Sequence, residues 1–226
     1  MELNANFDDR AAVHSEQEPW VASPMKGVDR RMLDRIGDEV ARATTIVRYA
    51  PGSAFSAHTH TGGEEFLVLD GVFQDEHGDF PVGTYVRNPP TTAHTPSAAD
   101  GATIFVKLWQ FDMEDRQQVT IDTTKLTPET VREGVAQIPL FEDARERVRI
   151  EIWEANAPVS EAGHDGFEAL VIEGSFSEGG ETFAANSWLR LPPDSPLSAV
   201  ACVEGARLWV KTGHLAITPT APKVVG

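Results

Sequence analysis

The chain has 226 residues, of which 41% are hydrophobic, and a formal net charge of −16 at pH 7. This hydrophobic fraction excludes wholesale disorder, and the length allows one large or two ordinary domains. The strong negative charge repels phosphate backbones, so direct binding of nucleic acid is not expected. An acidic surface of this kind favours solubility or a basic protein partner.

The sequence also argues against a membrane or secreted protein. No run of about eighteen apolar residues is present, which excludes a transmembrane helix. The N-terminal stretch MELNANFDDRAAVHSEQEPW is acidic and polar, so we expect no secretory signal. The single cysteine, Cys202, excludes an internal disulfide. Together these features predict a cytoplasmic protein.

Short predicted strands separated by glycine and proline turns follow one another along the chain. The periodicity of residues 29–42 allows a helix, but the β-branched run 44–47 and the central Gly37 favour two strands and a turn. Further strands are expected at 66–69, 84–87 and 103–111. This pattern is typical of an all-β barrel or sandwich.

The second half of the chain repeats the first. At an offset of 103 residues, FLVLDGVF (66–73) aligns with ALVIEGSF (169–176), and RNPP (87–90) aligns with RLPP (190–193). A unit of about 100 residues fits a duplicated domain and is too long for a solenoid repeat. The sequence therefore predicts two tandem barrels.

The predicted domain boundaries follow from this duplication. We expect the first barrel over residues 1–115 and the second over residues 131–226. The polar stretch 116–130 is expected to be the linker between them.

Two segments have a weaker pattern. Residues 1–19 lack periodicity and are expected to form an arm. Thr127-Pro128-Glu129 is typical of a helix start, which predicts a short helix over 128–136.

Three histidines and one glutamate in the first half carry the clearest chemical signal. His58 and His60 are two residues apart, which in a strand puts both imidazoles on one face, roughly 6 to 7 Å apart. Glu64 follows a Thr-Gly-Gly turn, and His94 follows a strand and a Pro-Pro turn. Three imidazoles and a carboxylate are a ligand set for a divalent metal of borderline softness. We therefore predict a metal site, with zinc or Fe(II) as the leading ions and manganese or nickel as alternatives.

Glu65, the neighbour of Glu64, competes with it for the role of carboxylate ligand. Strand alternation sends the two side chains to opposite faces, so only one of them can reach the metal. The spacing from the histidines selects Glu64, and Glu65 is expected outside the barrel or at its rim.

The second half lacks the metal ligands. The four corresponding positions are occupied by Glu161, Gly163, Phe167 and Leu197. Because apolar side chains stand where a metal would need donors, this barrel is expected to be structural or ligand-binding. The polar groups that remain nearby are expected to be solvated: Glu161, His164 and Glu168.

The spacing G-x5-H-x-H-x3-E-x6-G, followed by G-x5-P-x4-H, resembles the paired signature of the cupin superfamily. Its glycine and proline positions are occupied by Gly52, Gly71, Gly83 and Pro89. Thr91 stands where a glycine is usual, and Ala98 stands where an asparagine is usual. The resemblance implies two tandem cupin barrels, which are jelly rolls of the double-stranded β-helix type.

The stretch from about Trp20 to Trp109 resembles the cupin domain of the ChrR-type anti-sigma factors. VRYAPGSAFSAHTHTGGEEFLVLDGVFQDEHGDFPVGTYVRNPP and FVKLWQ carry this resemblance. It implies zinc binding and the sensing of oxidative stress such as singlet oxygen. In that family a separate helical zinc domain, with a His and two Cys, binds the sigma factor, whereas this chain has no Cys before Cys202. The same cupin type also occurs in metal-dependent dioxygenases that cleave diketones and hydroxy-ketones.

Two functions stay open at this point. One is a ChrR-like metal-binding regulatory or stress-sensing protein, for which a zinc site closed by four protein ligands would be suited. The other is an Fe(II)- or Mn(II)-dependent dioxygenase acting on a small diketone or hydroxy-ketone, with open coordination positions for the substrate. A third, a catalytically silent scaffold whose second barrel binds a small acid or sugar, rests on fold analogy alone. A small-molecule ligand, a protein partner and a homodimer are open as partners, and no membrane contact is expected.

Overall fold

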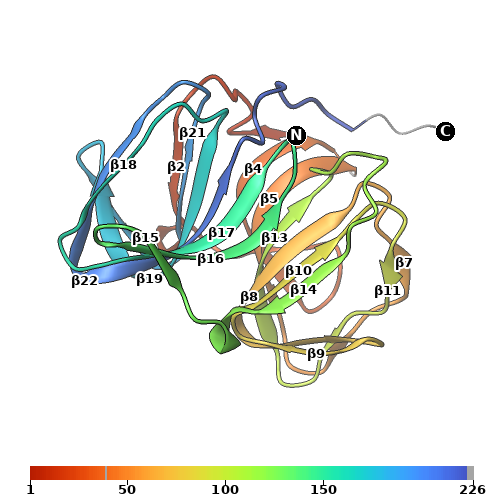
Figure 1. Cartoon of the computed structure of the whole chain (residues 1–226). Coiled ribbons are helices and arrows are strands. Elements are labelled where there is room, and N and C mark those ends of the chain that lie inside the picture. Colours follow the sequence, from red (N-terminus) through yellow and green to blue (C-terminus); the bar gives the residue numbers. More distant parts are fainter. Residues whose placement is uncertain (39, 223–226) are drawn as a thin grey trace. The chain divides into compact units, whose positions relative to one another are not determined.

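The computed structural model describes residues 1–38 and 40–222, and Figure 1 shows that nearly all of its regular secondary structure is β-strand. The all-β prediction is confirmed. The strands form two compact units, which are described separately below. None of the described helices is long and apolar enough to cross a membrane.

Of the described residues, the first unit comprises Met1–Ala5, Pro19–Lys125 and residues 220–222. Its large antiparallel sheet has the order β1-β4-β5-β13-β8-β10-β14, and β7 pairs with β11 in a separate small sheet. The strands of this unit are β1 (Glu2–Leu3), β3 (Val21–Ala22), β4 (Val28–Gly37), β5 (Ala41–Tyr49), β6 (Ser53–Ala54), β7 (His58–Thr59), β8 (Glu64–Asp75), β9 (Gly78–Pro81), β10 (Thr84–Asn88), β11 (Ala93–His94), β12 (Ser97–Ala98), β13 (Ala102–Leu108) and β14 (Val119–Asp122), followed by a 3₁₀ turn at Thr123–Lys125.

Strand alternation decides which side chains of the first unit face its interior. On β8, Phe66 and Val68 belong to the apolar core, together with Val86 of β10 and Val28 of β4. Glu64 has the same parity as Phe66, so its carboxylate lies on the interior face of β8. The alternation of β8 therefore directs the predicted carboxylate ligand to the interior of the unit.

The second unit comprises Asn6–Glu18 and Leu126–Pro219. Its antiparallel sheet has the order β15-β16-β17-β22-β19-β21-β2. The strands of this unit are β2 (Ala11–His14), β15 (Glu129–Arg132), β16 (Val135–Glu142), β17 (Arg147–Trp153), β18 (Pro158–Glu161), β19 (Phe167–Glu178), β20 (Glu181–Ala184), β21 (Ser187–Leu191) and β22 (Leu197–Thr212), with a 3₁₀ turn at Ser15–Gln17.

The two units repeat one another strand by strand. β8 and β19 are separated by the predicted 103 residues and have the same sequence of buried, half-buried and exposed positions. β10 and β21 have the same offset, and all of their residues are buried. The duplication seen in the sequence is thus a duplication of the fold.

Two local predictions are wrong. The expected arm contains β1, which pairs with β4, and β2, which pairs with β21 of the second unit. A strand added at a sheet edge needs only backbone hydrogen bonds, so side-chain periodicity gives no sign of it. The helix predicted over 128–136 is instead the hairpin of β15 and β16, because β-branched Thr130 and Val131 favour a strand and Gly134 turns the chain with φ +71°.

The extents of the two units differ from the predicted boundaries. β2 belongs to the second unit although it lies within the predicted first barrel. Part of the expected linker forms β14, which pairs with β10 of the first unit. Residue 39 in the predicted turn and residues 223–226 of the predicted second barrel lie outside the described residues.

Candidate metal centre

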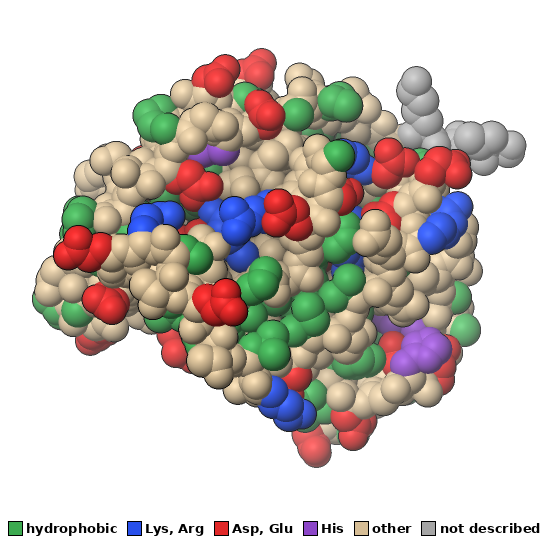
Figure 2. All heavy atoms as spheres, viewed as in Figure 1, with side chains coloured by type: hydrophobic (Ala, Val, Ile, Leu, Met, Phe, Trp, Pro, Cys, Tyr) green, Lys and Arg blue, Asp and Glu red, His purple; other side chains and the backbone are tan. Residues whose placement is uncertain are grey.

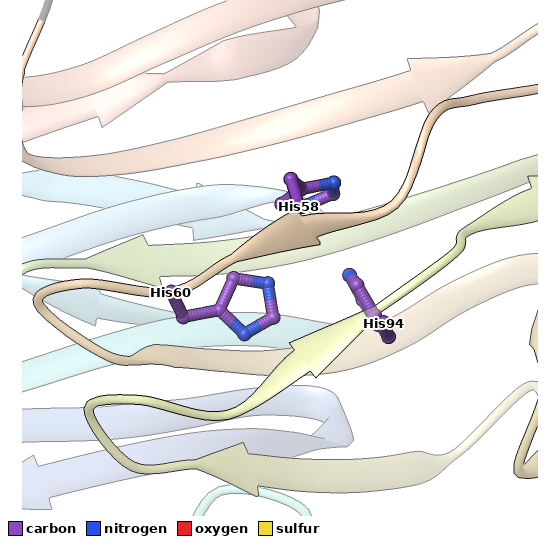
Figure 3. A group of neighbouring side chains, drawn as sticks. All are labelled: His58, His60 and His94. Atoms are coloured by element: carbon purple, nitrogen blue, oxygen red, sulfur yellow. The ribbon is translucent and has the colours of Figure 1, made fainter.

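Three histidines from two neighbouring chain segments converge in the first unit (Figure 3). His58 on β7 is paired in register with His94 on β11, and His60 follows directly after β7. The ring centroids are 5.1 Å apart for His58 and His60, 4.9 Å for His58 and His94, and 4.5 Å for His60 and His94. Each ring offers one nitrogen, and these nitrogens lie within 4.8 Å of one another. The predicted convergence of the imidazoles is therefore present.

The Nδ1 atom of each imidazole lies within hydrogen-bonding distance of an oxygen atom. Nδ1 of His58 lies 3.2 Å from the carbonyl oxygen of Ser56, and Nδ1 of His94 lies 3.1 Å from Oδ2 of Asp75. Nδ1 of His60 lies 3.2 Å from Oγ1 of Thr92, whose hydroxyl is committed as a donor to the carbonyl of Pro89. Nδ1 is thus the protonated nitrogen in each ring, and the Nε2 lone pairs are left for a metal.

Glu64, the predicted carboxylate ligand, lies at the first position of β8. Its Oε2 atom lies 3.4 Å from Nε2 of His60 and 3.8 Å from Nε2 of His94. Asn88, its register partner on β10, forms a side-chain hydrogen bond with it. The carboxylate is therefore fixed beside two of the three imidazole nitrogens that could bind a metal.

The buried polar atoms of this cluster fit a divalent ion. Within the described residues, Nε2 of His60 and Oε2 of Glu64 are buried and have no hydrogen-bond partner. Such atoms are costly to bury unless something satisfies them. Imidazole nitrogens and one carboxylate oxygen are donors that Zn²⁺ and Fe²⁺ accept. An ion at this point would satisfy both buried atoms at once.

Burial sets the protonation of the cluster in favour of metal binding. Desolvation, with the neighbouring His94 and His58, lowers the pKa of His60 to about 3. Desolvation also lowers the pKa of His94, against the opposing hydrogen bond with Asp75. Neutral imidazoles are the form that binds metal. Desolvation raises the pKa of Glu64 to about 7, so metal binding near neutral pH displaces a proton from this carboxyl.

The loop between His60 and Glu64 needs its two glycines. A Cβ on Gly62 would lie 2.0 Å from the Trp109 ring, and a Cβ on Gly63 would lie 2.4 Å from the Phe111 ring. The backbone of Trp109 also donates to the carbonyl of Gly63. These aromatic residues follow β13 and pack against the loop between His60 and Glu64.

A cavity of about 330 Å³ opens beside the cluster. His58, His60 and Glu64 line it, together with mostly aliphatic and aromatic side chains. Ligand pockets in proteins are commonly of this kind, with an apolar wall and a few fixed polar groups. The donor set therefore faces a space that can hold a small organic molecule.

Thr91 shows the cost of departing from the usual glycine. Its φ is +79°, in the left-handed region that favours glycine, and its amide donates to the carbonyl of His60. Ala98, the second departure, is buried in the core of the unit. Neither residue removes a metal donor, as expected from the sequence.

Three predictions for polar residues near the two sites are wrong. Glu65 does face away from Glu64, but it is buried and accepts a hydrogen bond of 2.6 Å from Tyr85. His164 and Glu168 are buried instead of solvated, and Glu168 accepts from the indole of Trp188 at 2.8 Å. Glu65 and Glu168 lie on strands that are buried on both faces at these positions, so alternation alone could not predict exposure. His164 lies in the loop before β19.

In the second unit the positions of the predicted metal ligands hold no cluster of metal donors among the described residues, and the one carboxylate there is paired with an arginine. Phe167 and Leu197, at the positions of Glu64 and His94, belong to the apolar core as predicted. Glu161, at the position of His58, pairs with the buried Arg149 at 2.8 Å. The same guanidinium contacts Glu151 at 2.7 Å. The buried guanidinium of Arg149 thus pairs with both carboxylates.

Asp75 and Asn88 are site residues that the sequence analysis missed. Asp75 has the parity of the core residue Phe73 on β8, and Asn88 has the parity of Val86 on β10. Each is a polar residue at the end of a strand, two positions after a core residue, and this pattern could have indicated that its side chain faces the interior. Asp75 holds His94, and Asn88 holds Glu64.

Comparisons with known proteins agree with this fold. A crystal structure of a candidate dioxygenase from Nostoc punctiforme superposes with a TM-score of 0.77 at 14% identity, covering 97% of this chain and 88% of that one. The bacterial pirin YhhW from Escherichia coli, solved with nickel(II), has a TM-score of 0.64 at 10% identity, over 90% and 98% of the chains. A single-substitution variant of oxalate decarboxylase from B. subtilis has a TM-score of 0.62 at 12% identity, over 90% and 77% of the chains.

The sequence comparisons concern the first half of the chain. No curated protein sequence matches this chain. Residues 8–112 match the family described as the ChrR cupin-like domain, a stretch that contains every predicted metal ligand. The prediction of tandem cupin barrels is confirmed by the fold, and the predicted resemblance to the ChrR-type cupin domain is confirmed by the match over residues 8–112.

Proposed function

We propose that this protein is a metal-dependent enzyme of the cupin type that converts a small organic molecule, with dioxygenase chemistry on a diketone or hydroxy-ketone as the reaction class. The observation that supports this most directly is the position of the donors on the wall of an apolar cavity of about 330 Å³. A purely structural metal site needs no adjoining space for a substrate.

His58, His60, Glu64 and His94 would hold the ion, and Fe(II) suits the proposed reaction. Bound Fe(II) would supply Lewis acidity towards the substrate and redox chemistry towards dioxygen. Zinc, manganese and nickel fit the same donors, and nickel(II) is present in the E. coli pirin of the same fold. The candidate dioxygenase from Nostoc punctiforme, also of this fold, supports the reaction class.

The protein contributes orientation and a dry surrounding. Asp75 and Thr92 fix the rings of His94 and His60, so their free nitrogens point to one place. Tyr49 and Trp109 line the cavity and exclude water from the bound molecule. If substrate binding released Glu64 from the ion, its carboxylate would be placed to accept a proton from the substrate.

Regulation or stress sensing is the second candidate. The match of residues 8–112 to the ChrR cupin-like domain supports it. In this case the metal would be zinc, and a change in metal occupancy would alter binding to a protein partner or the formation of a homodimer. Both candidates are proposed for a cytoplasmic protein, consistent with a single cysteine in the chain. On the face shown in Figure 2 the described basic side chains form no continuous patch.

An oxygen-uptake assay separates the two candidates. The protein is purified from unsupplemented cells, analysed for metals, and then supplied with Fe(II) and a series of small diketones. Turnover that requires Fe(II) and is lost in His60→Ala supports the enzyme, whereas bound zinc without oxygen uptake supports the regulator. His164→Ala in the second unit is the matched control and should keep the wild-type rate.

A further inference from the structure

Arg30 faces the same cavity as the candidate metal ligands. It lies on β4 in register with Val47, and it has the parity of Val28, whose side chain belongs to the core. Its side chain lines the cavity together with His58, His60 and Glu64. Among the described lining residues it is the single Lys or Arg side chain. A permanent positive charge is therefore presented to whatever the cavity binds.

The guanidinium of Arg30 has no carboxylate partner within the described part of the chain. Its Nε atom is buried and has no hydrogen-bond partner among those residues. Two other arginines of the same unit are paired with carboxylates: Arg48 lies 2.8 Å from Asp29, and Arg87 lies 2.6 Å from Asp115. A partly buried guanidinium without a partner is costly, and a carboxylate is the group that matches its donors in pairs.

The charges around the cavity also favour an anion, although the chain as a whole is strongly negative. Glu64 is the single carboxylate among the described lining residues. With a divalent ion bound, the ion and Arg30 together outweigh the negative charge of Glu64. The rest of the wall is largely apolar, with Tyr49, Phe55 and Trp109 as its aromatic residues. Such a wall accommodates a short hydrocarbon body.

We propose that the cavity selects a small keto acid, whose carboxylate pairs with Arg30 while its keto oxygen faces the metal ligands. This inference rests on the proposed function and narrows its substrate class from ketones in general to ketones that carry a carboxylate. Arg30 is then the residue that determines specificity, because an uncharged diketone leaves its guanidinium unpaired.

Calorimetry with two matched probes tests the proposal. 2-Oxobutanoate and 2,3-pentanedione differ in that a methyl group replaces one carboxylate oxygen. Each is titrated into wild-type protein in the metal-free form and loaded with redox-silent nickel(II). We expect wild type to bind the acid at least about 10-fold more tightly than the diketone, the discrimination that an unpaired buried charge produces. Equal affinities, or no binding of either probe, would overturn the proposal.

Three variants locate the determinant. Arg30→Gln should abolish the preference for the acid, and Arg30→Lys should retain part of it. Arg48→Gln, which removes a half-exposed guanidinium outside the cavity, should leave the preference unchanged. Lys26 lines a neighbouring hollow with His58, so Lys26→Gln is a further control. If Lys26→Gln abolishes the preference and Arg30→Gln does not, the assignment to Arg30 is wrong.

The failure of this inference can be told from the failure of the proposed function. Thermal unfolding and nickel content are measured for every variant. If wild type binds no metal, the metal-dependent function fails, while the preference of the metal-free protein for the acid still reports on Arg30. If wild type binds nickel but does not prefer the acid, the metal site stands and the keto acid is excluded.

Discussion

Oδ2 of Asp75 lies 3.1 Å from Nδ1 of His94, and both side chains are buried. The carboxylate orients the imidazole and makes its other nitrogen a better metal ligand. Asp75 is therefore expected to contribute to metal affinity without touching the ion.

Asp75→Asn should weaken metal binding by about 10- to 100-fold, the usual effect of removing such a partner. Competition with a chromogenic chelator measures this. Asp79→Asn is a matched control, since Asp79 is exposed on the neighbouring β9 and accepts a hydrogen bond from Gln74. An unchanged affinity in Asp75→Asn, or an equal loss in both variants, would show that Asp75 does not support the site.

Gly62→Ala should disturb the loop that carries His60 and Glu64. The new Cβ would lie 2.0 Å from the Trp109 ring, so the loop or the ring must move. We expect a loss of about 1 to 3 kcal/mol in the free energy of unfolding and a lower metal content. Urea unfolding and elemental analysis measure these two quantities. Adding Trp109→Ala should restore the metal content if the clash is the cause, and no recovery would argue against it.

Substituting glycine for Thr91 should raise the stability of the protein, whereas substituting glycine for Thr92 should lower its metal affinity. Thr91→Gly relieves a non-glycine residue at φ +79° and should stabilise the protein by about 1 kcal/mol. Thr92→Gly removes the hydroxyl that lies 3.2 Å from Nδ1 of His60, and should lower metal affinity. Urea unfolding and chelator competition on both variants give the answer. Destabilisation by Thr91→Gly would mean that its hydroxyl or methyl group has a role of its own.

The stability of the metal-free protein should depend on pH through Glu64. Burial raises the pKa of this carboxyl to about 7 from the usual 4.5. As the pH rises above 4.5, the unfolded chain loses this proton first, so the folded state loses stability up to about pH 7. The loss should be on the order of 1 to 3 kcal/mol.

Urea unfolding in EDTA between pH 4 and pH 8 tests this dependence. Glu64→Gln has no proton to lose, and its stability should exceed that of wild type most at the alkaline end. His60 acts in the opposite sense: its pKa is about 3 instead of 6.5, so its contribution is lost as the pH falls below 6.5. Parallel pH profiles of wild type and Glu64→Gln would contradict a buried, proton-holding Glu64.

The fold and the four candidate metal ligands could be predicted from the sequence for a physical reason. The spacing of the ligands and the repeated glycines constrain the backbone locally, and a 103-residue offset is visible without any structure. The residues that hydrogen-bond to these candidate ligands could not be predicted. Asp75 meets His94, and Thr92 meets His60, through contacts between separate segments. Arg30 lines the cavity, and its buried Nε atom has no hydrogen-bond partner within the described residues; no sequence pattern reveals either feature.

The edges of the barrels were equally hard to predict. β2 is held by backbone pairing with β21, which lies far along the chain and leaves no periodic signature in AAVH. The buried carboxylates Glu65 and Glu168 were expected outside because alternation was taken to mean exposure of one face. Both faces of β8 and β19 are buried at these positions.

Three imidazoles and Glu64 are proposed to hold one divalent ion in the first unit, and the proposed metal-dependent reaction depends on that ion. Elemental analysis of the purified protein, with protein concentration from amino-acid analysis, tests this most directly. We expect about one ion per chain in wild type and in His164→Ala, and far less than one in His60→Ala and His94→Ala. A full complement of metal in both of the latter variants, or equal losses in His60→Ala and His164→Ala, would contradict it.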